Sequence, residues 1–204
     1  MDWDALPAVE HAFARHDEPV RFEVATLADP VVFRVLTERN YRLIGFENVV
    51  AKTLAPSEVA HPAEAMRDFD EWRDVTIGGF LNGDGTGAQG HVVSRAEIEQ
   101  VFDDVRDAPG YQRYIIRMDG RAVAAASMRI DGDIVVLAGA ATLPAFRRRG
   151  AQSRLLATRL RDAHAQGARL AVMTCWPGSQ SQANAMRQGF SLLYARAVLV
   201  QSAR

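Results

Sequence analysis

The sequence predicts an α+β protein with one mixed β-sheet, and two observations carry that prediction. Three segments rich in strand-forming residues follow one another over residues 111–141, separated by Asp-Gly turns, which is typical of an antiparallel meander. An apolar helix pattern over residues 151–167 then leads into another apolar segment at 170–174. We therefore expect the meander to continue into a β-α-β crossover onto a parallel neighbour, with a partial β-α-β repeat in front at residues 21–54.

The N-terminal part of the chain supplies the elements of that partial repeat. Residues 4–16 have the apolar spacing of a short helix, and residues 21–26 read as a strand. Pro30 suits the first turn of the next helix, which should end near Asn40. The β-formers that follow predict an extended segment over residues 41–54.

The middle of the chain has clear helix and loop signals. Residues 63–81 have apolar residues on one side and predict a helix. Four glycines between Asn82 and Gly90 predict a mobile loop that borders an acceptor site. Ser94 and Glu97 form the pattern of a capping box, so another helix should begin there.

A basic turn connects the last strand of the meander with its helix. The turn runs from Arg147 to Gly150, and the helix after it has an apolar stripe from which Arg159 falls mostly off. The first N–H groups of a helix lack intrahelical partners, and the helix dipole adds positive potential there. Because Gly150 has no Cβ, a phosphate can come close to the backbone. On these residues alone, a phosphate-binding turn and a solvated basic turn are both open.

The segment from Pro144 to Gln152 resembles motif A of the GNAT N-acetyltransferases, which reads Arg/Gln-x-x-Gly-x-Gly/Ala after Pro-x-aromatic. Arg147 takes the first position and Gly150 the glycine, while Gln152 stands where Gly or Ala is usual. The resemblance implies a GNAT-like fold and acetyl-CoA as co-substrate. It also implies that the pyrophosphate is bound by Arg148, Arg149, Gly150, Ala151, Gln152 and Ser153, and that the pantetheine arm meets the backbone of Ala141, Thr142 and Leu143.

A second group of residues resembles the same family further along the chain. Asn184 occupies the position of an asparagine that contacts the cofactor, and Gly189-Phe190 matches the pair that ends that helix. Tyr194 follows at the spacing of the tyrosine that often protonates the CoA thiolate. The alternatives are a surface residue of a helix for Asn184 and an aromatic on a strand face for Tyr194.

The resemblance implies an acetyl-CoA-dependent N-acyltransferase that acetylates a primary amine of a small molecule by direct attack. The thiol of CoA has a pKa of about 8.5, so a nearby phenol can protonate the leaving thiolate. The attacking amine must be neutral, and its ammonium form has a pKa of about 10, so a base must remove a proton. Glu71 and Asp74 are candidate bases, with solvated helix carboxylates as the alternative. A CoA-binding regulatory module and a protein-modifying subunit without small-molecule turnover are the other function classes that remain.

The resemblance covers about residues 58–202, and we expect residues 58–204 to form the acetyl-CoA-binding GNAT N-acetyltransferase domain. The elements of residues 21–54 repeat in order over 169–203, with Arg39-Asn40-Tyr41 at the place of Gln188-Gly189-Phe190. We therefore expect residues 1–57 to be a partial, non-catalytic GNAT-like half-unit. Coincidence between two β-α-β fragments is the alternative.

Composition excludes several classes of function. With 204 residues and a net charge of −1, the chain shows no general attraction to nucleic acid or to a membrane surface. It has one cysteine, so no internal disulfide forms, and its five histidines have no metal-ligand spacing, so we expect no metal. No apolar run approaches ~20 residues, and acidic residues stand where a signal peptide has basic ones. We expect a cytoplasmic protein, and a homodimer stays open.

Overall fold

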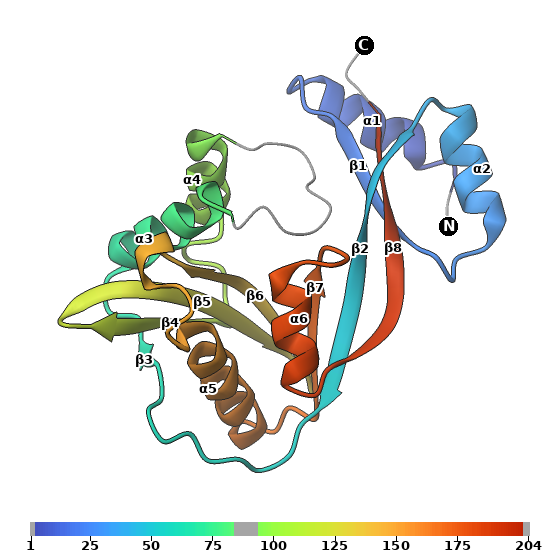
Figure 1. The fold of residues 1–204 in the computed structure, drawn as a ribbon. Helices are drawn as coiled ribbons and strands as arrows, with labels where there is room; N and C mark the ends of the chain where they lie inside the picture. The colour runs from blue at the N-terminus through green and yellow to red at the C-terminus, as the bar shows by residue number, and fades with distance from the viewer. Residues whose placement is uncertain (1–2, 84–93, 202–204) are drawn as a thin grey trace.

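The computed structural model describes residues 3–83 and 94–201. Within this part of the chain, the strands form one mixed sheet in the order β1-β8-β2-β7-β6-β5-β4-β3 (Figure 1). The strands are β1 Val20–Ala25, β2 Arg42–Thr53, β3 Glu64–Ala65, β4 Tyr111–Met118, β5 Arg121–Asp131, β6 Ile134–Thr142, β7 Leu170–Cys175 and β8 Ser191–Gln201. The helices are α1 Leu6–Ala14, α2 Pro30–Glu38, α3 Phe69–Leu81, α4 Arg95–Asp104, the 3-10 turn η1 Pro144–Phe146, α5 Ala151–Ala165 and α6 Gln180–Arg187.

The predicted meander and crossover are confirmed. Strands β4, β5 and β6 pair antiparallel, and β7 pairs parallel to β6 after α5. Helices α3 and α5 cover opposite faces of the meander (Figure 1). Ala124 packs in the same core as Leu155 of α5, whereas Ala125, next along β5, packs with Trp72 of α3. This alternation is the period-two pattern of a strand that is buried on both faces.

Strand β2 lies in the middle of the sheet, between β7 and β8. It pairs antiparallel with both, through residues 48–53 on the β7 side and residues 42–51 on the β8 side. Strand β1 closes the sheet on the outer side of β8. The N-terminal segment therefore supplies a central strand that the C-terminal elements lack, an insertion that the order of elements along the chain did not predict.

The two helices beside the β2–β8 pair end in the same way. The amide of Tyr41 bonds to the carbonyl of Leu36 at 3.0 Å, and the amide of Phe190 bonds to the carbonyl of Ala185 at 3.1 Å. The residue before each aromatic has a positive φ, 65° at Asn40 and 84° at Gly189. Both aromatic residues are buried. The segments aligned in the sequence thus have matching helix ends, while the division into domains at residue 57 stays a prediction.

Some local boundaries differ from the sequence-based expectations. The helix expected over residues 63–81 begins only at Phe69, because the Asp68 side chain accepts bonds from the amides of Asp70 and Glu71 and so caps it. The residues before it include β3, which pairs with β4. The capping box at Ser94 is confirmed, with both of its hydrogen bonds present. Most of the predicted glycine loop, residues 84–90, lies outside the described residues.

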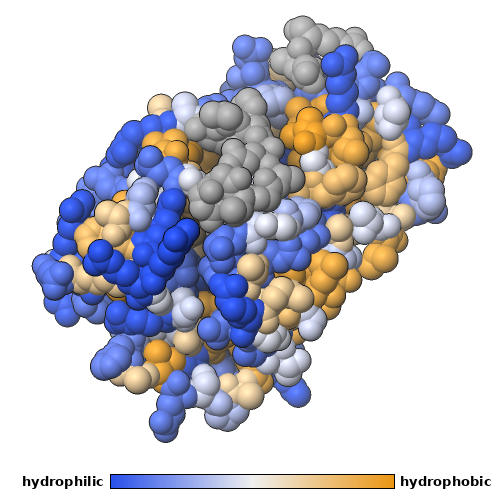
Figure 2. Space-filling view, in the orientation of Figure 1, coloured by the Kyte–Doolittle hydropathy of each residue, from blue (hydrophilic) through white to orange (hydrophobic). Residues whose placement is uncertain are grey.

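Apolar surface gathers over β2 and β8, on the side of the molecule drawn in Figure 2. The large apolar side chains exposed on these two strands are Leu43, Ile44, Phe46, Leu192 and Leu193. No helix in the described part of the chain is long and apolar enough to cross a membrane.

Candidate functional site

The sheet opens where β6 and β7 stop pairing. Their parallel ladder ends at Leu137 and Met173, although β6 continues to Thr142 and β7 to Cys175. On its other side, β6 makes a bulge against β5, because Gly139 and Ala140 of β6 lie opposite a single residue of β5. Beyond Leu137 the β7 side of the β6 backbone therefore has no strand partner in the described part of the chain and can meet a ligand.

The bulge is held from the α5 face by a buried arginine. Arg159 Nη1 donates to the carbonyls of Ser127 at 2.9 Å and Ala138 at 3.3 Å. The sequence pattern placed Arg159 mostly off the buried stripe of its helix, which is wrong, because its long side chain reaches through the core to these carbonyls. Burial lowers the pKa of Arg159 to about 10, so it remains cationic at neutral pH. Gly139 has φ 60°, and a Cβ there would meet Ser127 Oγ at 3.2 Å, so this position favours glycine.

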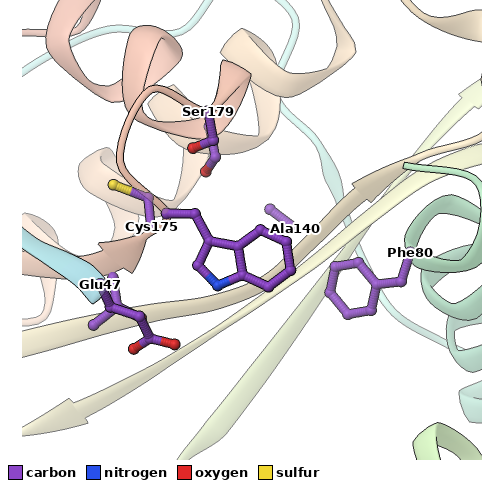
Figure 3. Close-up of a pocket in the computed structure, with 8 residues that line it drawn as sticks. Glu47, Phe80, Ala140, Cys175 and Ser179 are labelled. Carbon is purple, nitrogen blue, oxygen red and sulfur yellow. The ribbon is translucent and has the colours of Figure 1, made fainter. Parts of the chain in front are cut away.

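A cavity of about 250 Å³ lies at the opening between β6 and β7 (Figure 3). Its described lining residues are Glu47, Phe80, Ala140, Thr174, Cys175, Trp176, Ser179 and Ser181. Sequence reasoning missed Glu47 because this residue comes from β2 and joins the site only through the strand order. The one available signal was a carboxylate within a run of β-formers, which is unusual for a central strand.

The basic turn leads into an uncapped helix. Gly150 is the N-cap residue of α5 with φ 80°, and no side chain of the described residues caps the helix start. The first intrahelical bond runs from the amide of Arg154 to the carbonyl of Gly150 at 3.1 Å. The N–H groups of residues 151–153 precede it and point out of the helix end, where they can bind an anion.

The arginines of the turn divide into two kinds. Arg147 turns inward and donates to the carbonyls of Thr142 and Gly79 at 3.3 and 3.2 Å, so it ties α3 to the end of β6. Arg148 and Arg149 are exposed at the helix start, and the Arg149 guanidinium stacks 5.3 Å from the Phe146 ring centroid. These two guanidinium groups remain available to a phosphate.

Gln152 connects the turn to the strand end. Its Nε2 donates to Thr142 Oγ1 at 2.9 Å. Because Ala140 lines the cavity and Thr142 contacts the turn, one short stretch of β6 runs from the cavity to the helix start. This stretch and the turn bring together two groups of predicted site residues, 141–143 and 148–153.

The family comparison agrees with this geometry. The model of the acetyltransferase (GNAT) family matches residues 70–190, more than half of the chain. This protein belongs to the GNAT family. Members of the family transfer acetyl groups from acyl-CoA and normally use acetyl-CoA. Comparison with curated protein sequences gave no match.

Solved structures share the fold at low sequence identity. A GCN5-related N-acetyltransferase from Kribbella flavida is 22% identical, with a TM-score of 0.69 over 97% of this chain and 74% of that one. A GCN5-related N-acetyltransferase from Sphaerobacter thermophilus is 13% identical, with a TM-score of 0.66 over 100% and 70%. A tandem GNAT protein from the clavulanic acid biosynthesis pathway is 10% identical, with a TM-score of 0.66 over 98% and 69%. At these identities the likeness establishes the fold alone.

Two of the predicted GNAT site residues lie away from the turn. The Asn184 side chain accepts bonds from Gln180 and Arg187, both on its own helix α6. Tyr194 lies on β8 in register with Val49, which is in register with Thr174 of β7. Tyr194 therefore shares the cavity's face of the sheet but is two strands, or about 10 Å, from β7. It is not among the described residues that line the cavity.

The two candidate bases on α3 are engaged elsewhere. Glu71 forms a salt bridge with Arg117, and Asp74 forms one with Arg95 at 2.8 Å. Neither carboxylate is among the described lining residues of the cavity. Within residues 3–83 and 94–201, no group of three or more His, Cys, Asp or Glu side chains could hold a metal ion.

Proposed function

We propose that this protein transfers the acetyl group of acetyl-CoA to the primary amine of a small molecule by direct attack. One observation carries the proposal: an uncapped, arginine-flanked helix start is joined by residues 140–142 of β6 to a cavity between two separated strands. A pyrophosphate at one end and a thioester at the other fit this path. The proposal includes a cytoplasmic setting, in keeping with the single cysteine.

The chain's own groups account for most of the steps. Arg148, Arg149 and the amides of residues 150–153 would hold the pyrophosphate, and the backbone of residues 141–143 would hold the pantetheine arm. The thioester carbonyl then lies at the bulge of β6, where unpaired backbone N–H groups would stabilise the oxyanion that forms when the amine attacks. The C–N bond forms and the C–S bond breaks, the attacking nitrogen loses one proton to solvent, and the thiolate takes up a proton.

Tyr194 is the proton donor in this proposal, and Asn184 is a further cofactor contact. The half-buried position of Tyr194 on the cavity's face of the sheet supports its role, while its distance from β7 requires the CoA sulfur to lie towards β2. Asn184 would have to exchange its bonds to Gln180 and Arg187 for one to the cofactor. Both roles are therefore separate tests of the proposal.

We further propose that residues 1–57 form a GNAT-like half-unit that has no cofactor site of its own. The matched helix ends place Val35 at the position of Asn184. In the β2–β8 ladder, Phe46 of β2 pairs with Ala197 of β8, and Tyr194 of β8 pairs with Val49 of β2. When the two units are matched, these two pairs correspond, so Phe46 takes the position of Tyr194. The half-unit thus has apolar side chains where the second unit has the polar ones, and the likeness to a tandem GNAT protein is in keeping with this origin.

The proposal is tested by following thiol release from acetyl-CoA against a library of small amines. Calorimetry with acetyl-CoA in the absence of an amine is the second measurement. We expect micromolar to millimolar binding and turnover with at least one amine. Binding without turnover of any amine would favour a regulatory CoA-binding module, and absence of binding would refute the cofactor site.

A further inference from the structure

We propose that Glu47 is the group that recognises the acceptor's ammonium, and that the acceptor is a small monoamine with an apolar, preferably aromatic, body. The inference rests on the proposed function and names the class of substrate for that site. Its starting point is the cavity between β6 and β7, in which Glu47 is the single charged residue among the described lining residues.

Glu47 is fixed in place before any ligand arrives. Its Oε1 accepts from Arg21 Nη2 at 3.2 Å, and its Oε2 accepts from Arg196 Nη2 at 2.5 Å. Each arginine also contacts Glu23, at 3.2 Å from Arg21 and 2.8 Å from Arg196. The two arginines and two glutamates balance in charge, so the carboxylate is held without a surplus of positive charge around it.

The held carboxylate keeps capacity for a cationic ligand. An ionised carboxylate has about four acceptor sites, and each oxygen of Glu47 uses one of them on a guanidinium. The Glu47 side chain is 14% exposed and lines the cavity. An ammonium is the ligand that matches a largely buried carboxylate with unused acceptor sites.

The other lining residues and the volume of the cavity indicate which kind of acceptor it can hold. Glu47 and Phe80 lie on opposite sides of the group of lining residues drawn in Figure 3. The rings of Phe80 and Trp176 offer apolar faces that also attract a nearby cation. An amine bound to Glu47 would direct its carbon body towards Phe80 and leave its nitrogen in the same cavity as Ala140. A volume of about 250 Å³ is at the low end for ligand pockets, which favours a small acceptor.

A second charge on the acceptor would find no partner among the described residues of the cavity. No arginine, lysine or histidine is among these lining residues, and Arg21 and Arg196 each already contact both Glu23 and Glu47. An amino acid would therefore have to desolvate its carboxylate in an apolar cavity beside another carboxylate, which is costly. The inference thus separates 2-phenylethylamine from phenylalanine, which carries the same ring and amine.

The experiment titrates 2-phenylethylamine into the full-length protein saturated with CoA, a complex that cannot react, and measures the dissociation constant by calorimetry. Ethylamine and phenylalanine are titrated in parallel. We expect 2-phenylethylamine to bind at least about tenfold more tightly than either, because ethylamine lacks the ring and phenylalanine adds an unpaired charge. Equal binding of phenylalanine, or no binding of 2-phenylethylamine, would overturn the inference.

The variant Glu47→Gln is compared with a matched control, Glu23→Gln. Both glutamates bind Arg21 and Arg196, but only Glu47 is among the lining residues of the cavity. We expect Glu47→Gln to weaken binding of 2-phenylethylamine by roughly 10- to 100-fold, the usual size for loss of a charge-assisted bond, and Glu23→Gln to leave it within about twofold. Equal losses in the two variants would mean that the arginine network only supports the sheet.

The outcome is distinguishable from failure of the proposed function. Affinity for CoA, measured in the same variants, should stay unchanged, because neither glutamate is near the turn at residues 148–153. If the wild-type protein binds no CoA, the cofactor proposal fails, and amine binding is then measured with the protein in the absence of CoA. If CoA binds and amines are acetylated, but without dependence on Glu47, only the present inference fails.

Discussion

Removal of residues 1–57 should prevent folding, because it takes a strand out of the middle of the sheet. The sequence alone predicts that a chain starting near Pro56 is less stable or less soluble than the full chain. The strand order makes the expected effect larger, since β2 pairs with β7 through six residues and with β8 through nine. Without β1 and β2, strand β8 has no neighbouring strand among the remaining described residues.

The size of the loss follows from the structure. Val49 and Val50 of β2 are 4% and 0% exposed, and burial of each valine contributes about 1.5–3 kcal/mol. Each hydrogen bond of the two ladders contributes about 0.5–1.5 kcal/mol net, so together they add on the order of 10 kcal/mol. The sum is comparable with the ~5–15 kcal/mol that stabilises a whole domain. The shortened chain should therefore be largely unfolded or aggregated.

The assay compares two shortened chains by gel filtration and urea unfolding. Removal of residues 1–18 is the control, because it deletes α1 but keeps β1 and β2. That change loses the buried Leu6 and the bonds of Glu10 to Arg39 and Tyr41, so we expect a decrease of about 2–4 kcal/mol in the free energy of unfolding. A monodisperse chain starting at residue 58 with wild-type cooperativity would refute the reasoning, since β2 would then be dispensable.

Three further predictions concern the site. The proposed phosphate site predicts that Gly150→Glu abolishes acetyl-CoA binding in calorimetry, because it adds a carboxylate and a Cβ at a position with φ 80° in that site; unchanged affinity would remove the turn from the site. The role proposed for Tyr194 predicts that Tyr194→Phe lowers kcat by ~10²–10⁴-fold with little change in the KM for acetyl-CoA; a near-wild-type kcat would leave it as a strand residue. Arg159→Met should change the free energy of unfolding by less than about 2 kcal/mol. The Ser127 carbonyl loses the hydrogen bond from Arg159, but a desolvated cation is removed, and the Ala138 carbonyl still accepts a hydrogen bond from the Ser127 hydroxyl. A loss of about 4 kcal/mol or more in urea unfolding would show that the cation is a net stabiliser.

The parts of the fold that the sequence predicted are those fixed by local signals. The Asp119-Gly120 turn and the apolar periodicity of the segments around it define the meander, and Ser94 with Glu97 defines a helix start. The turn at Gly150 was likewise predictable, because its glycine and arginines are adjacent in the chain.

The parts that the sequence did not predict depend on contacts between distant segments. Nothing local to residues 42–53 shows that this strand enters between β7 and β8. Glu47 reaches the cavity only through that insertion, and so no motif near it could identify it. Arg159 has the spacing of a surface residue on its helix, and its burial depends on carbonyls presented by β5 and β6.

The position of β2 also determines when the protein can fold during its synthesis. β1 and β2 are complete by residue 53, but their partners β7 and β8 begin at residues 170 and 191. At ~5–20 residues per second, the ribosome needs on the order of ten seconds to supply the missing strands. Until then both N-terminal strands have unpaired edges, which attract other chains. Strands β1 and β2 thus leave the ribosome well before the strands they pair with, and the sheet cannot form in the order in which its strands are synthesised.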